Sequence, residues 1–348
     1  MGKREEVLVK WDKDKKWEEL KEIKSVFVNP DDTIDPIPGV RYFMSECGGS
    51  KQPLKEEIIA MIISFLLTGI VPLLMALAVI GWYSVRARVV LLLSFLSLLI
   101  PCKVYDTSVL KWKIWDTFSI VFDEPMDKHT KYLFAEYPHG VTPLGCIVSG
   151  FAFPHFSPEI PCYISTRIPL VSSLIPLSDY QKCSDHSLLW NATRENIRKA
   201  LQTGSCAVVV DGIAGMYVNE PKKEMVKFSG RKGFVRAAVD TGSPIRPVYQ
   251  FGTSQLMKLV PKCLEPVARK FACAMGLIVG RWGLPIPKKV MLMSVIGRTI
   301  EVKKMDKNEP GYDDYVDEIQ QKVADEIQRV YYKYRGAYGW SERPLEIY

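Results

Sequence analysis

Cysteine and histidine patterns that bind metal ions are missing from this sequence of 348 residues. It has eight cysteines but no Cys-x-x-Cys pair, and its four histidines form neither an HExxH motif nor an i, i+4 pair. Zinc sites are usually built from such spacings, so we expect no bound metal ion. The cysteines lie singly in apolar stretches such as 205–208, which is typical of buried, reduced thiols in a protein that faces the cytosol.

Signature motifs of several large enzyme classes are also missing. The absence of a GxSxG motif argues against a serine hydrolase, and the absence of a GxGxxG or Walker A loop argues against a nucleotide-binding fold. No recognisable nucleic-acid-binding motif occurs, so we expect no nucleic-acid partner. Residues 3–24 are densely charged where a secretory signal would be apolar, so we expect no signal peptide.

Charge is unevenly distributed along the chain. The whole sequence has a formal net charge of +7. Residues 1–57 contain 11 Lys and Arg and 13 Asp and Glu, which gives a net charge of −2 and leaves +9 for the remainder. A basic body next to a hydrophobic segment is typical of a protein that meets a membrane surface or a phosphate-bearing substrate.

A long hydrophobic block follows the charged beginning of the chain. Residues 58–85 contain no charged side chain, and at about 1.5 Å per residue a helix of this length can span a bilayer. Pro72 predicts a kink, Arg86 and Arg88 interrupt the block, and residues 89–101 are apolar again. Three interpretations are open: a membrane hairpin, one spanning helix followed by a re-entrant or interfacial helix, and a buried hairpin of a soluble protein.

Lysines flank the block on both sides, and only the two arginines lie inside it. Because positive charge marks the cytosolic side of a membrane segment, this pattern favours the hairpin with both ends in the cytosol. The predicted organisation is a charged cytosolic leader over 1–57, a membrane-embedded helical hairpin over 58–101 and a cytosol-facing domain over 102–348.

Short apolar runs alternate with amphipathic stretches after residue 115. Strand candidates are Tyr132–Ala135, Cys162–Ser165, Ala207–Val210, Arg246–Phe251 and Val290–Ile296. Helix candidates are Asn191–Leu201, Phe234–Asp240 and a long amphipathic helix through Val316–Tyr334, which we expect Gly336 to end. This alternation predicts an α/β fold with a mainly parallel sheet and flanking helices.

The run Tyr137–Gly140 carries the strongest chemical signal. It places His139 between Pro138 and Gly140, on a tight turn directly after a strand candidate. Catalytic groups of α/β proteins tend to lie at such strand ends, and a histidine can take a proton from a hydroxyl near neutral pH. A histidine that only shapes the turn is an equally good interpretation of this motif alone.

Two further segments contain glycine-bounded motifs. In residues 230–236, two glycines bracket Arg231 and Lys232, and an apolar helix follows. Cations and backbone N–H groups at a helix N-terminus can bind phosphate, although a solvated basic turn explains the pattern equally well. Residues 242–252 indicate a turn that leads into a buried strand, and this segment taken alone indicates only a structural role.

Together and in this order, these segments resemble the type-2 diacylglycerol acyltransferase family, which includes monoacylglycerol and wax-alcohol acyltransferases. The resemblance runs from about Phe134 to the end of the chain. Its motifs lie in Phe134–Gly145, Val208–Gly212, Arg231–Arg236, Pro247–Gly252, Val295–Val302 and Tyr332–Gly339. The hydrophobic block also lies where this family has its endoplasmic-reticulum anchor.

The resemblance implies a catalytic site on these segments. His139, held between Pro138 and Gly140, would be the general base on the free hydroxyl of a diacylglycerol, which would attack the thioester of an acyl-CoA. Backbone N–H groups near Gly140 would stabilise the oxyanion. The residues that would hold the CoA phosphates are Arg231, Lys232, Gly233 and Arg236.

The resemblance also implies the enzyme's setting. It would be an acyl-CoA:diacylglycerol O-acyltransferase that makes triacylglycerol at the endoplasmic reticulum membrane, or at lipid droplets, with its catalytic domain in the cytosol. The expected partners are the bilayer, acyl-CoA as co-substrate and diacylglycerol. No metal and no bound cofactor is implied, and the sequence leaves open whether the chain forms a homo-oligomer.

The sequence departs from the family pattern after the central strand. Family members usually have Gly-Gly-x-x-Glu there, whereas this chain has Asp211-Gly212-Ile213-Ala214-Gly215, so glycine replaces the glutamate. Asp211 is then the candidate acid partner of His139. The departure leaves two alternatives open. One is another acceptor, namely monoacylglycerol, a wax alcohol, a sterol or a lysophospholipid, and the other is a non-catalytic membrane protein that binds acyl-CoA or lipid.

Overall fold

The computed structural model describes two short parts of the N-terminal region and most of the chain from residue 117 onward. The described residues are 18–28, 34–44, 58, 84–85, 89, 117–157, 162–166, 180–182, 187–218, 220–270 and 274–348. The predicted membrane hairpin over 58–101 lies outside them except for residues 58, 84–85 and 89. Within the described ranges, no helix combines the length and the apolar composition needed to cross a bilayer.

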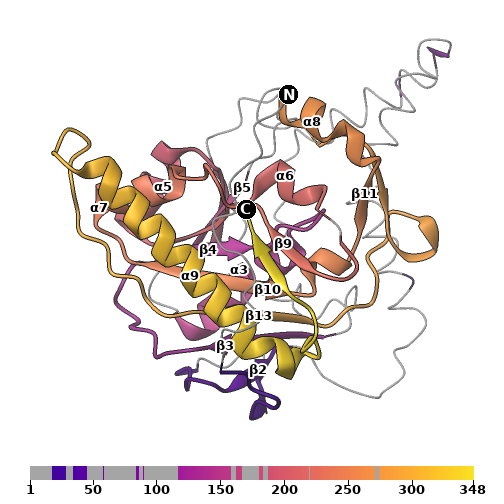
Figure 1. Cartoon of the computed structure of the whole chain (residues 1–348), viewed down its shortest axis with the longest axis horizontal. Coiled ribbons are helices and arrows are strands. Elements are labelled where there is room, and N and C mark those ends of the chain that lie inside the picture. Colours follow the sequence, from indigo (N-terminus) through magenta and orange to yellow (C-terminus); the bar gives the residue numbers. More distant parts are fainter. Residues whose placement is uncertain are drawn as a thin grey trace.

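A ten-stranded sheet runs through the described structure (Figure 1). Its spatial order is β1-β2-β3-β13-β10-β4-β8-β5-β7-β6. The strands are β1 (Ser25–Phe27), β2 (Arg41–Phe43), β3 (Phe118–Phe122), β4 (Leu133–Tyr137), β5 (Cys162–Thr166), β6 (Tyr180–Lys182), β7 (Ser187–Asn191), β8 (Ser205–Val209), β10 (Ile245–Phe251) and β13 (Leu292–Ile296). The central strands β10, β4, β8 and β5 pair in parallel, which confirms the mainly parallel sheet. Four strand candidates overlap these central strands, and the candidate Val290–Ile296 overlaps β13.

The charged leader contributes to one end of this sheet. The leader contains β1 and β2, which pair in parallel. β2 also pairs antiparallel with β3, which lies outside the leader. The side chain of Arg41 in β2 is buried and donates from Nε to the Ser119 hydroxyl at 2.8 Å. The described part of the leader therefore packs as an integral edge of the sheet.

Helices cover both faces of the sheet. On one face, α5 (Arg194–Thr203), α7 (Gly233–Thr241) and α9 (Tyr312–Tyr338) pack together, and Figure 1 shows α9 running obliquely across the molecule. On the other face lies α3 (Leu144–Phe156), which the sequence did not predict. The helix predictions at 191–201 and 234–240 correspond to α5 and α7.

The two-sided packing is visible along β4. Leu133, Ala135 and Tyr137 belong to the core formed with α5, α7 and α9. Phe134 points the other way and stacks on Phe153 of α3, with ring centroids 4.4 Å apart. Both faces of β4 are therefore buried, as parallel strands between two helix layers require, and the strand end is held rigidly.

The long C-terminal helix α9 extends past its predicted end. We expected Gly336 to end it, but the helix continues to Tyr338, and Gly339 ends it in the left-handed conformation (φ +96°). A Cβ on Gly336 would lie 2.8 Å from the carbonyl oxygen of Leu20. The backbone N–H of Leu20 donates to the carbonyl oxygen of Lys333 in α9 at 2.8 Å. Glycine at this position therefore makes room for the leader against the helix.

Smaller elements complete the described structure. They are α6 (Gly212–Met216), α8 (Glu265–Lys270), the 3-10 turns η2 (Thr253–Gln255), η3 (Lys262–Leu264) and η4 (Arg281–Gly283), and the strands β9 (Glu224–Val226), β11 (Lys258–Val260), β12 (Leu277–Val279) and β14 (Leu345–Ile347). β11 pairs with β12, and β9 pairs with β14. The last pair ties the end of the chain to the loop that precedes α7.

Candidate active site

Three neighbouring parallel strands bring their carboxyl ends to one edge of the sheet. β4 leads into residues 138–140, β8 leads into 210–212, and β10 leads into 252–253. β4 lies between β8 and β10, so the segment with His139 lies between the other two. Side chains that are distant in sequence meet there, at the edge where open α/β sheets bind ligands.

The turn at residues 138–140, called here the histidine turn, is packed tightly against the end of β10. Gly140 has a φ of +63°, and a Cβ on it would lie 2.7 Å from the carbonyl oxygen of Thr253. Both the left-handed conformation and the close approach require glycine. Pro138 is buried and His139 is half-buried, so the turn presents the imidazole at the edge of the core.

The hydrogen bonding of His139 fixes the chemistry of its ring. Nδ1 lies 2.8 Å from the carbonyl oxygen of Gly140. A carbonyl oxygen only accepts, so Nδ1 carries the hydrogen and donates. In the neutral ring, Nε2 then has a lone pair that is ready to accept a proton, as a general base requires.

The side chain of Asp211 holds the histidine turn by accepting a backbone N–H of that turn. Its carboxylate is fully buried, and both of its oxygens lie 3.0 Å from the backbone nitrogen of His139, whose N–H they accept. Burial raises the pKa of Asp211, and this effect is partly offset by the nearby His139 and Arg231. The structure thus brings the predicted acid, Asp211, to His139. Asp211 contacts the main chain of His139, whereas the imidazole ring of His139 bonds to Gly140.

Gly215, where the resemblance implies a glutamate, lies directly against this carboxylate. A Cβ on Gly215 would lie 2.2 Å from Asp211 Oδ2 and 2.5 Å from its Cγ. Carbon atoms do not approach so closely, so any larger residue at 215 displaces the Asp211 side chain. Asp211 and Gly215 are therefore a matched pair, in which the carboxylate from position 211 fills the space next to position 215.

The basic segment 231–236 divides into two parts. Arg231 reaches the site, where its Nη2 donates to the carbonyl oxygen of Asp211 at 3.3 Å. Lys232 and Arg236 instead form ion pairs with acids of α9. These pairs are Lys232 with Asp317 and, at 3.1 Å, Arg236 with Asp313. Gly233 is the first residue of α7 and has open space around its Cα. Of the predicted phosphate-binding cations, the structure places Arg231 beside the histidine turn.

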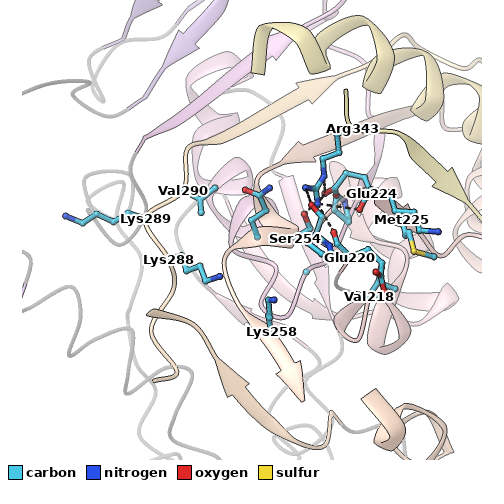
Figure 2. Close-up of a pocket in the computed structure, with 16 residues that line it drawn as sticks. Val218, Glu220, Glu224, Met225, Ser254, Lys258, Lys288, Lys289, Val290 and Arg343 are labelled. Carbon is cyan, nitrogen blue, oxygen red and sulfur yellow. Dashed lines mark hydrogen bonds and ion pairs between the residues drawn. The ribbon is translucent and has the colours of Figure 1, made fainter. Parts of the chain in front are cut away.

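A cavity of about 290 Å³ opens next to the histidine turn (Figure 2). Pro138, Gly140 and Gly215 line it on the side of the turn. Its wall also includes Ser254, just after β10, and Arg343, near the end of the chain. The candidate catalytic turn and the C-terminal segment therefore share one binding space.

A sequence profile of the family described as "Diacylglycerol acyltransferase" matches residues 103–347. The chain belongs to the diacylglycerol acyltransferase family. Members of this family are acyl-CoA-dependent acyltransferases of lipid biosynthesis, and this chain is accordingly an acyltransferase.

Curated relatives of the acyltransferase agree with this assignment. Diacylglycerol O-acyltransferase 2-like protein 6 of Bos taurus is 25% identical over 271 residues, which cover 67% of this chain and 77% of the relative. 2-Acylglycerol O-acyltransferase 1 of Bos taurus is 25% identical over 270 residues (69% and 78%). Diacylglycerol O-acyltransferase 2 of Xenopus tropicalis is 26% identical over 270 residues (66% and 70%).

Among solved structures, the acyltransferase is similar to the 1-acyl-sn-glycerophosphate (LPA) acyltransferase of Thermotoga maritima. The TM-score is 0.33 and the sequence identity 13%, over 79% of this chain and 98% of that chain.

Sequence reasoning missed a buried polar network behind the histidine turn of the acyltransferase. Glu136, the penultimate residue of β4, is completely buried, and burial raises its pKa to about 8. Gln250 donates from Nε2 to Glu136 at 3.2 Å and to the Ser149 hydroxyl at 3.0 Å, and Ser149 lies 2.6 Å from the Ser294 hydroxyl. The signal in the sequence is the presence of polar side chains at 136, 250 and 294 within largely apolar strands.

Proposed function

We propose that this acyltransferase transfers the acyl group of an acyl-CoA to the free hydroxyl of a diacylglycerol. His139 Nε2 removes the hydroxyl proton while the oxygen attacks the thioester carbonyl carbon. The C–O bond forms, the C–S bond then breaks, and the imidazolium returns the proton to the CoA sulfur. The products are triacylglycerol and free CoA, and backbone N–H groups near Gly140 stabilise the oxyanion formed in between.

One observation supports this proposal most strongly. The Nδ1–H of His139 is engaged with Gly140, which leaves the Nε2 lone pair of the neutral ring for a proton, and the residues on either side of His139 line the cavity. Asp211 keeps the turn in this arrangement by accepting the His139 backbone N–H, so it acts as a positioning residue. Arg231 supplies positive charge beside the same turn.

The acceptor has a second candidate. 2-Acylglycerol O-acyltransferase 1 is as similar to this chain, at 25% identity, as the relatives named for diacylglycerol. Transfer to a monoacylglycerol uses the same base, the same thioester and the same oxyanion, and differs only in the lipid that delivers the hydroxyl. The product of the reaction distinguishes the two acceptors.

We place the reaction at the endoplasmic reticulum membrane with the catalytic domain facing the cytosol. Diacylglycerol lies in a bilayer, so the enzyme must meet a membrane surface. An exposed apolar group around η4 suits such a contact: Trp282 is 71% exposed, Leu277 is 62% exposed, and Leu284 is also exposed. Arg281 lies over the Trp282 ring at 5.3 Å from its centroid, which joins a cation to the apolar tip, as is common at membrane interfaces.

The test uses microsomes from cells that lack their own triacylglycerol synthesis and express the full chain. Labelled oleoyl-CoA is supplied with diacylglycerol, monoacylglycerol, a fatty alcohol, a sterol or lysophosphatidate, and the labelled lipids are resolved. We expect labelled triacylglycerol from diacylglycerol. A different labelled ester would replace the proposed acceptor, and no product from any acceptor, with the protein well expressed, would refute the catalytic proposal in favour of a lipid-binding protein.

A further inference from the structure

The cavity beside the histidine turn has an excess of positive charge. The carboxylate of Glu224 in its wall is buried and is neutralised by Arg343, whose Nε donates to Oε1 at 2.8 Å. Two further charged side chains of the wall are also paired: Lys223 with Glu346, and Glu220 with Lys262. Charges that already have partners hold the wall together and contribute little attraction for a ligand.

Two lysines of the wall have no such partner. Lys258 in β11 and Lys288, between η4 and β13, are exposed, and neither has an acidic partner among the described residues. In Figure 2 the ammonium ends of both side chains turn toward the cavity, while Lys289 extends away from it. Two cations directed at one cavity without a counter-charge favour the binding of an anion there.

The position of this site suggests which anion it binds. The same cavity reaches Pro138 and Gly140 on either side of His139, so a ligand held by the lysines extends toward the catalytic base. Acyl-CoA has the matching layout, with phosphates at the nucleotide end and the thioester at the other. A volume of about 290 Å³ encloses only part of such a molecule, so the remainder lies outside the cavity.

We propose that Lys258 and Lys288 bind phosphate groups of the acyl-CoA, an assignment that rests on the proposed acyl transfer. This moves the phosphate site away from Lys232 and Arg236, whose charges are paired with α9. Arg231 remains beside Asp211, close to the reacting groups.

The experiment combines direct binding with kinetics on the full chain. Binding of free CoA to the purified protein is measured for the wild type, for K258Q/K288Q, and for K303Q/K307Q, which removes two positive charges from an exposed loop elsewhere. KM is then measured for oleoyl-CoA and for oleoyl-pantetheine, which has the thioester without the nucleotide phosphates.

We expect K258Q/K288Q to weaken CoA binding and to raise the KM for oleoyl-CoA about 10- to 100-fold, because two charge-assisted contacts are lost. Its KM for oleoyl-pantetheine stays within about twofold of the wild type, and the control variant changes neither value. Unchanged CoA binding would overturn the assignment, as would an equal loss for both donors. Failure of acyl transfer is recognised separately, because free CoA binding needs no turnover.

Discussion

Enlarging Gly215 is expected to slow the enzyme, because a larger side chain at position 215 displaces the neighbouring Asp211 carboxylate. In Gly215→Ala, the new methyl carbon would lie 2.2 Å from Asp211 Oδ2, more than 1 Å inside ordinary contact distance. The Asp211 side chain must shift, and the two contacts of 3.0 Å to the backbone nitrogen of His139 are lost.

The size of the effect follows from the stranded N–H group. A buried donor without a partner costs about 1–3 kcal/mol. Added in full to the activation free energy of acyl transfer, this penalty lowers kcat/KM about 5- to 150-fold, at about 1.4 kcal/mol per factor of ten. The assay is the initial rate of labelled triacylglycerol formation, with thermal unfolding of the purified protein measured in parallel.

Two double variants separate the clash from the missing carboxylate. Gly215→Ala with Asp211→Gly removes the clash but leaves the His139 N–H without its acceptor, so the unfolding temperature recovers only in part and the activity stays low. Gly215→Glu with Asp211→Gly supplies a carboxylate from the other member of the matched pair, one helical turn further on, and activity is regained. Wild-type activity in Gly215→Ala alone would refute the role given to Asp211.

The remaining predictions concern stability and the membrane surface. Glu136 has an ordinary pKa of 4.5 when unfolded and about 8 when folded, so its contribution to stability is complete below pH 4.5 and is lost, at about 1.4 kcal/mol per pH unit, as the pH rises to about 8. Glu136→Gln should flatten this slope in denaturant unfolding between pH 5 and 8; an unchanged slope contradicts the assignment. Arg343→Met strands the buried carboxylate of Glu224 and should lower stability by about 3–5 kcal/mol, part of which a second change, Glu224→Gln, restores. Without that recovery, the ion pair is not the cause. Trp282→Ser should slow turnover of diacylglycerol in vesicles but not of a short-chain, water-soluble diacylglycerol; equal slowing would place Trp282 in the folding of the domain.

The sequence was informative where the chemistry lies on buried strands. The segments that became β4, β8 and β10 are largely apolar because both faces of a central parallel strand are covered. Pro138 and Gly140 mark the turn after β4 in any reading. Since parallel neighbours end at the same edge, the proximity of His139 and Asp211 follows from correct strand assignments.

Other features depend on contacts that no local pattern encodes. Gly336 lies inside α9, where it makes room for the leader, and the sequence does not distinguish such a glycine from one that ends a helix. The pairing of Lys232 with α9 depends on where a helix 80 residues later crosses α7. Lys258 lies in the short strand β11 and Lys288 lies in a loop, and neither belongs to a recognisable motif, so only the fold brings them to one cavity.

The most direct test of the central claim is the rate of acyl transfer in His139→Ala, compared with His129→Ala, a histidine on the exposed turn before β4. Loss of a general base is expected to lower kcat about 10²- to 10⁴-fold while free CoA binding is unchanged, and the His129 variant should match the wild type. A His139→Ala enzyme that forms triacylglycerol within a few-fold of the wild-type rate would contradict the assignment of His139 as the base.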